Sequence, residues 1–250
     1  ARTHWTRVER RQAEKTYNPV ATADLATRFP GVDWARLMAG TGIPAQGETI
    51  IATPSAIEGT AKLIDSIPLE IWKDYLAFHT IRDAAPYLPK AFVDANFEMY
   101  NKTLGGQPQP QPRWQRGVDL TSSVLGEALG KLYVTEYFPP EAKAKADVLV
   151  KNIIAAMDTR LENLAWMDPK TRAAAREKLA AFTPKIGYPD KWTDYSAFEV
   201  TRGDALGNAK RAALFEHDRD VAKLGRPVDR SEWFMTPMTV NAYANPTWNE

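Results

Sequence analysis

Helical periodicity, interrupted at intervals by proline and glycine, is the feature that most constrains the fold of this chain. Over 141–164 apolar residues recur every three or four positions, which places them on one side of a long helix. Asp168-Pro169 then predicts a new helix, because Asp is a good N-cap and Pro suits the first turn. Further helices are expected over 55–67, from Pro68 onward, 90–104, 205–221, and from a cap at Thr121 or Ser122 to about Tyr137, with Leu125, Leu129 and Leu132 inward.

Two short segments are β-prone. Residues 49–53 (TIIAT) are rich in β-branched side chains and are followed by Pro54, and 237–243 (PMTVNAY) form the second candidate strand. Residues 105–112 (GGQPQPQP) form a linker, because their prolines and glycines exclude a helix. The predicted fold class is mainly α, with multi-helix lobes and a small β element near the C-terminal end.

Charge and composition exclude several classes of protein. Lys plus Arg number 32 and Asp plus Glu 31, so the net charge is +1 and nucleic acid is not an expected partner. The chain has no cysteine, which excludes disulfides and thiolate metal sites. It also has no run of about 18 apolar residues, so no membrane span is expected.

The three histidines are His4, His79 and His217, and they are far apart in the sequence. None belongs to a His-Glu-x-x-His motif, in which two histidines one helical turn apart bind one zinc ion. His79 is predicted to pack on an apolar helix face, and His217 to lie on a charged, solvated one. The sequence also contains no Gly-x-Ser-x-Gly nucleophile motif. We therefore predict no metal ligand and no catalytic residue within these 250 residues.

A series of short motifs, most of them in the second half of the chain, resembles the motifs of a known protein family. In chain order they are RW at 113–114, LGEALGKLY at 125–133, LAWMD at 164–168, KIGYPD at 185–190, KLGRPVDR at 223–230, EW at 232–233, MTP at 235–237 and VNAY at 240–243. Together they resemble the neprilysin and endothelin-converting enzyme family of zinc metallopeptidases. The first half is similar more loosely, through YNP at 17–19 and WKDY at 72–75.

The resemblance implies a zinc metalloendopeptidase that hydrolyses short peptides outside the cytoplasm, in the periplasm or cell envelope. Family members are longer, and their His-Glu-x-x-His helix follows the region that resembles this chain. The chain is therefore expected to be an internal fragment, inactive and free of zinc by itself, with the motif supplied by downstream sequence or a second polypeptide. Gly117 stands where the family has a cysteine, which suggests a bacterial member.

The resemblance also implies a domain organisation. Residues 1–104 would belong to a helical cap lobe, 105–112 to the linker, and 113–236 to a helical region that leads to the catalytic lobe. Residues 237–250 would contain the edge strand on which peptides lie, with Asn241 and Ala242 as substrate-binding residues. An edge strand can pair with an extended peptide of any sequence, and an Asn amide offers both donors and an acceptor.

Other interpretations remain open. Asn241 could simply satisfy a turn before Asn245-Pro246, and Tyr243 is expected to be a packing residue. The chain could be a non-catalytic helical peptide-binding or scaffold protein derived from a peptidase, or a proteolytic piece without a separate function. The sequence encoded after Glu250 discriminates between these, because a His-Glu-x-x-His motif there excludes the non-catalytic protein.

Overall fold

The computed structural model describes residues 3–44, 47–246 and 248–250, and it is mainly helical, as predicted. The chain forms two compact units. One contains Ala1–Pro110 and Thr201–Pro227, and the other contains Gln111–Val200 and Val228–Glu250. None of the described helices is long and apolar enough to cross a membrane.

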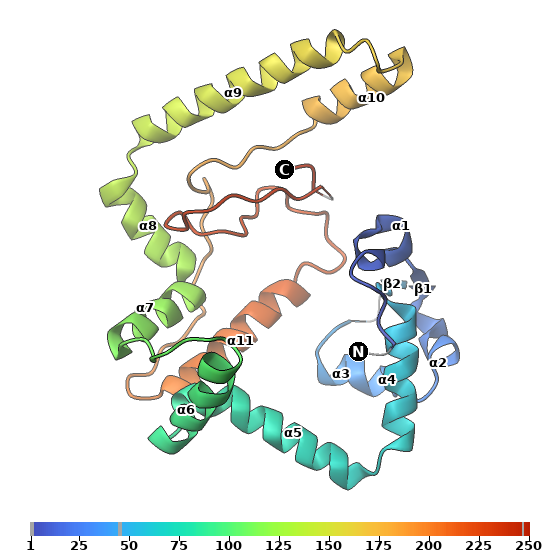
Figure 1. The fold of residues 1–250 in the computed structure, drawn as a ribbon, viewed down its shortest axis with the longest axis vertical. Helices are drawn as coiled ribbons and strands as arrows, with labels where there is room; N and C mark the ends of the chain where they lie inside the picture. The colour runs from blue at the N-terminus through green and yellow to red at the C-terminus, as the bar shows by residue number, and fades with distance from the viewer. Residues whose placement is uncertain (1–2, 45–46, 247) are drawn as a thin grey trace. The chain divides into compact units, whose positions relative to one another are not determined.

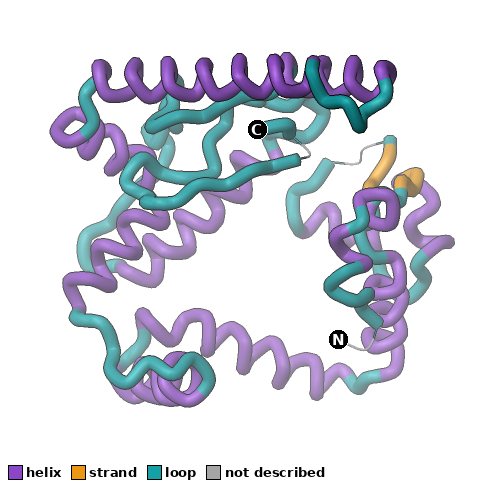
Figure 2. Tube along the Cα trace, turned by 45° about the horizontal axis from the view of Figure 1, so that its top comes forward, coloured by secondary structure: helices purple, strands orange, loops and turns teal. Residues whose placement is uncertain are grey.

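The first unit holds the two strands found among the described residues, which are orange in Figure 2. β1 (Pro19–Ala21) pairs antiparallel with β2 (Glu48–Ile50), with Val20 opposite Thr49. A small core of Leu25, Phe29 and Ile51 packs beside them. The predicted strand over 49–53 is thus shorter and begins one residue earlier, because β1 is only three residues long and Pro54 already begins a helix.

Helices make up the rest of the first unit (Figure 1). The expected helices over 55–67 and 205–221 form as α4 and α11, and the apolar stretch after Pro68 forms α5. The bounds are η1 (Glu9–Arg11), α1 (Ala13–Thr16), η2 (Thr22–Asp24), α2 (Leu25–Arg28), α3 (Trp34–Gly40), α4 (Pro54–Ser66), α5 (Leu69–Ala84), η3 (Ala85–Tyr87), α6 (Lys90–Asn96), the π-helix η4 (Phe97–Thr103) and α11 (Ala205–Val221).

The second unit contains α7 (Arg113–Val124), α8 (Gly126–Tyr137), α9 (Pro140–Glu162) and α10 (Pro169–Ala180). α10 returns alongside α9, as Figure 1 shows. Asp168 caps α10 as predicted, since its Oδ1 accepts a hydrogen bond from Thr171 N at 3.0 Å. Arg176 of α10 donates two hydrogen bonds to Asp158 of α9, at 2.7 and 2.9 Å, which joins the two helices.

The prediction of one helix capped at Thr121 or Ser122 is wrong. Two helices cover this region and meet at Leu125, whose φ of −115° lies outside the helical range. Thr121 does not cap a helix, because its hydroxyl donates to Gly117 O one turn earlier, at 2.9 Å. Leu132 is not inward either: it is 70% exposed, whereas Gly126 and Gly130 form the buried face of α8.

The predicted strand over 237–243 does not form. A strand needs a neighbour to accept and donate its ladder hydrogen bonds, and the described residues provide none for this segment. Figure 2 accordingly shows the end of the chain as loop. The segment is held by other contacts, which define the candidate site.

Candidate functional site

The candidate site is built around residues 236–250 of the second unit, and α8 positions the beginning of this segment. Gly126 and Gly130 lie one turn apart on the buried face of α8. A Cβ added to Gly126 would lie 2.6 Å from Thr236 Cγ2, and one added to Gly130 would lie 2.7 Å from Pro237 Cδ. The two missing side chains therefore leave a groove in which Thr236 and Pro237 pack directly against the helix backbone.

A turn follows this docking point. Thr239 N donates to Thr236 O at 3.0 Å, and the two threonine hydroxyls lie 2.8 Å apart. Asn241 N then donates to Thr239 O at 3.0 Å, and Asn241 Oδ1 accepts from Ala242 N at 2.8 Å. The side-chain oxygen of Asn241 thus bonds within its own segment, while its Nδ2 makes no hydrogen bond to any described residue.

Beyond the turn, several main-chain groups have no hydrogen-bond partner among the described residues. The backbone groups of Val240, Tyr243 and Ala244 make no hydrogen bond with another residue in the described part of the chain. Val240 is fully exposed, and Asn241 and Ala242 are exposed as well. Exposed, unpaired N–H and C=O groups are what an edge strand offers to an added strand.

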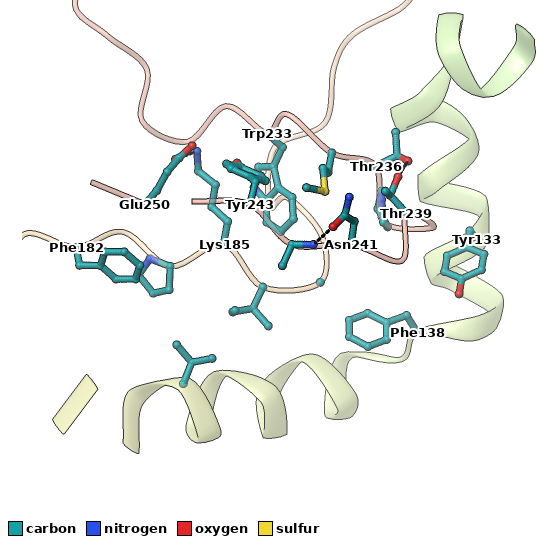
Figure 3. A pocket seen from close by; sticks show the side chains of 17 residues that line it. Tyr133, Phe138, Phe182, Lys185, Trp233, Thr236, Thr239, Asn241, Tyr243 and Glu250 are labelled. Carbon is teal, nitrogen blue, oxygen red and sulfur yellow. Dashed lines mark hydrogen bonds and ion pairs between the residues drawn. The ribbon is translucent and has the colours of Figure 1, made fainter. Parts of the chain in front are cut away.

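A buried ion pair lies at the other end of the segment (Figure 3). The ammonium of Lys185 contacts the carboxylate of Glu250, and their side chains are only 7% and 3% exposed. Lys185 Nζ also donates to Glu232 O at 2.6 Å and lies 5.3 Å and 5.5 Å from the ring centres of Trp248 and Phe234. Such rings stabilise a desolvated cation through their negative faces.

Tyr243 joins this cluster. Its ring lies edge-on to Phe234, with ring centres 6.2 Å apart. Partial burial, and then the neighbouring carboxylate of Glu250, raise the pKa of the Tyr243 phenol. Tyr243 therefore stays protonated at neutral pH, and its contacts agree with the predicted packing role.

A cavity of about 630 Å³ opens beside the segment. Asn241, Ala242 and Tyr243 lie on one wall, as Figure 3 shows for the two that it labels. The remaining lining is mostly apolar and comes from α8, α9, the loop after α10 and the approach to the turn: Tyr133, Phe138, Val150, Phe182, Pro184, Lys185, Ile186, Gly187, Trp233, Met235, Thr236, Pro237, Thr239 and Glu250.

The loop that carries Lys185 is itself fixed. Gly187 has a φ of +76°, a conformation that favours glycine, and a Cβ there would lie 2.3 Å from the Phe138 ring. Lys143 of α9 donates to Tyr188 O and to Asp190 Oδ1, both at 2.8 Å. The loop that carries Lys185 is thus packed against Phe138, which follows α8, and bonded to Lys143 of α9.

The residues present do not fit a zinc site. His217 Nε2 lies 2.7 Å from Thr41 O, and since a carbonyl only accepts, that nitrogen carries the proton. The ring of His79 packs 4.3 Å from that of Tyr75. Within 3–44, 47–246 and 248–250, no three His, Asp or Glu side chains gather as metal ligands.

Sequence reasoning missed the two features that hold the segment. The spacing of Gly126 and Gly130 was a usable signal, because small residues one turn apart allow another chain to approach a helix closely. Lys185 and Glu250 are 65 residues apart, and nothing in their local sequences predicts that they pair. The predicted Asn241 and Ala242 lie between these two anchors, and their role as substrate-binding residues stays a prediction.

Comparison with known proteins identifies the family. A profile described as Peptidase family M13 matches residues 1–189. The chain belongs to this family. An endothelin-converting enzyme homolog of Locusta migratoria is 30% identical over 97% of the chain, and human endothelin-converting enzyme 1 is 29% identical over 97%. The resemblance to this family of zinc metallopeptidases is thereby confirmed.

Solved structures of M13 relatives share the fold. The zinc metalloprotease Zmp1 of Mycobacterium tuberculosis, crystallised with an inhibitor, matches 99% of the chain with 43% identity and a TM-score of 0.92. PepO from Lactobacillus rhamnosis matches 94% with a TM-score of 0.82, and at 23% identity it shows the fold alone. The higher identity to a bacterial than to an animal M13 protein supports the predicted bacterial origin.

The chain spans about a third of these relatives. It covers 36% of the locust protein, 33% of the human enzyme and 38% of Zmp1. Membership of M13 therefore establishes the family of zinc peptidases, while the activity and substrates of the whole protein are matters for proposal.

Proposed function

We propose that this chain supplies the helical cap and the peptide-binding segment of a zinc metalloendopeptidase that cleaves short peptides. The observation that carries the proposal is the segment 240–244, in which the main-chain groups of Val240, Tyr243 and Ala244 have no partner among the described residues. It is exposed, it lies beside a cavity, and it is anchored at both ends. M13 membership supplies the chemistry, which is peptide hydrolysis at zinc.

Binding would occur by strand addition. An extended peptide would pair with the free main-chain groups of Val240 and Ala244, which would lie on one edge of the extended segment. Such pairing gives affinity without regard to peptide sequence. Asn241 Nδ2, which has no partner among the described residues, would donate to a peptide carbonyl. Because Asn241 Oδ1 is held by Ala242 N, the amide is oriented before the peptide arrives.

The zinc would be held outside these 250 residues, either further along the same gene product or on a second polypeptide. The described residues gather no suitable ligand set, so we assign no catalytic step to them. The chain alone would then be inactive. An extracytoplasmic location is proposed from the family resemblance only.

The test replaces Asn241 in the protein expressed from its complete gene. Loss of one hydrogen bond of about 0.5–1.5 kcal/mol predicts a two- to tenfold lower kcat/KM for Asn241→Ala on a short quenched peptide. Asn152→Ala is the matched control, because Asn152 is an exposed residue of α9 whose side chain makes no hydrogen bond to another described residue and does not line the cavity. Equal kcat/KM values for the two variants would exclude Asn241 from binding.

The same assay tests the non-catalytic alternative. A protein that binds the peptide but never cleaves it, even with zinc supplied, would be a peptide-binding or scaffold protein. Cleavage by the wild-type protein would exclude that alternative.

A further inference from the structure

We infer that Lys185 is a positioning residue: through Glu250 it fixes the C-terminal end of the peptide-binding segment, residues 240–244. The inference rests on the proposed function for its effect on peptides. Its structural part, the restraint of the segment, can be tested without activity.

The ammonium of Lys185 contacts several parts of the chain that are distant in sequence. It contacts the Glu250 carboxylate and donates to Glu232 O at 2.6 Å. It also lies near the rings of Phe234 and Trp248. One side chain thus joins the loop after α10 to residues before and after the segment. Figure 3 shows Lys185 beside Glu250.

Glu250 transmits this restraint through the chain that follows the segment. Asn245 N donates to Glu250 O at 2.8 Å, and Glu250 N donates back to Asn245 O at 3.3 Å, so the two residues close a loop. Asn249 reinforces it from the same side: Thr183 N donates to Asn249 O at 2.9 Å, and Asn249 Nδ2 donates to Lys178 O at 2.8 Å. Asn245 follows Ala244 directly, so this loop fixes where the segment ends.

The main chain of residues 240–244 has no comparable restraint. Thr236 and Pro237, before it, are docked on Gly126 and Gly130, and Asn245, after it, is held by Glu250. Val240 and Ala244 make no main-chain hydrogen bond to described residues. A strand that must pair with a peptide needs fixed ends and free edges, because each disordered residue adds an entropic cost to binding. The ion pair fixes the end of the segment and leaves the main-chain groups of Val240 and Ala244 free to bind a peptide.

Burial makes the pair suitable for this role. Both side chains are more than nine-tenths buried. Removal of the lysine therefore leaves a buried carboxylate without a counter-ion, and the desolvation penalty favours its movement into solvent. The segment next to it would then move. Replacement of both partners by apolar residues of similar size removes that penalty, so it separates the loss of positioning from loss of the fold.

The experiment compares Lys185→Met, the double variant K185M/E250M and the control Lys143→Met, in the protein expressed from its complete gene. Lys143 is a suitable control because its side chain is also largely buried, 18% exposed, and it holds Tyr188 and Asp190 on the same loop without contacting residues 240–250. Hydrogen exchange and peptide cleavage are measured for each.

We expect exchange of the hydrogen-bonded amides of Asn245, Trp248 and Glu250 to be about tenfold faster or more in K185M. In K143M, which loosens the Lys185 loop but leaves the ion pair in place, we expect a change of less than about twofold. We expect KM for a short peptide to rise about fivefold or more with kcat within about twofold, because a binding contact rather than a reacting group is lost. K185M/E250M should recover thermal stability but retain the fast exchange, because methionine replaces neither the ion pair nor the hydrogen bond from Lys185 Nζ to Glu232 O.

The outcomes are distinguishable. Exchange of the Asn245, Trp248 and Glu250 amides that is the same in K185M and wild type would overturn the inference, whatever the activity. A double variant that recovers slow exchange together with stability would also overturn it, since the pair would then be ordinary packing. A wild-type protein that cleaves no peptide would refute the proposed function, and the exchange data would still decide the role of Lys185.

Discussion

Alanine at Gly130 tests how the binding segment is docked on α8. The new Cβ would lie 2.7 Å from Pro237 Cδ, 3.1 Å from Pro237 Cγ and 3.5 Å from Trp192 Cζ3. A proline ring cannot rotate away, so either Pro237 or α8 must move. Overpacking of this kind costs about 1–3 kcal/mol.

A second effect opposes this cost. Alanine is favoured over glycine within a helix by about 1 kcal/mol. The net loss is then about 0–2 kcal/mol, which lowers Tm by up to roughly 8 °C for a chain of this size. Gly117→Ala isolates the helix effect, because Gly117 is an exposed residue of α7 with nothing within 4 Å of an added Cβ. We expect G117A to raise Tm by about 2–4 °C.

Thermal unfolding followed by far-UV circular dichroism measures both variants. Gly126→Ala should lie between them, because its Cβ would meet only Thr236 Cγ2, the end of a side chain that can rotate. If G130A gains as much stability as G117A, then Pro237 does not rest on α8, and the account of how the segment is positioned fails.

Two further predictions concern the framework of the second unit. Hydrogen bonds from the Thr171 hydroxyl and backbone N–H lower the pKa of Asp168, so its carboxylate stabilises the fold above the unfolded pKa of about 3.9, and this contribution is lost as the pH falls through the lower folded value. The Tm difference between wild type and Asp168→Asn should accordingly favour wild type at pH 6 and shrink below about pH 4, and a difference that grows in acid would show that the sign is wrong. Gly187→Ala combines a φ of +76° with a Cβ 2.3 Å from the Phe138 ring, and it should cost about 2–4 kcal/mol by urea unfolding. Gly203→Ala, with a φ of +83° but no neighbour within 4 Å, should cost only about 1–2 kcal/mol, and equal losses would mean that Phe138 does not press on Gly187.

Local signals in the sequence predicted the helices well. Asp168-Pro169 begins α10, and the stretch from 205 to 221 forms α11 over the expected residues, because caps and helical periodicity are properties of neighbouring residues. The prediction failed where a contact from distant sequence decides the structure. Thr121 carries a good N-cap side chain, yet the helix runs through it, and the buried face of α8 is defined by glycines because Thr236 and Pro237 pack there.

The candidate site shows the same limit. Asn241 and Ala242 were identified through resemblance to a family, and the expected strand did not form because its pairing partners are not among the described residues. The contact between Lys185 and Glu250 depends on the tertiary fold alone. Their burial, rather than any motif, distinguishes them from the exposed ion pairs Lys73–Glu70 and Lys90–Asp94, which contribute little.

Zinc content measured together with cleavage of a short quenched peptide tests the central claim most directly. The claim is that this chain supplies the peptide-binding segment and that residues elsewhere hold the metal. It predicts neither stoichiometric zinc nor cleavage for the 250-residue chain alone, and both for the protein expressed from its complete gene, or for the chain mixed with the downstream polypeptide. Stoichiometric zinc and cleavage by the chain alone would contradict it, because ligands would then have to come from His4, His79 or His217.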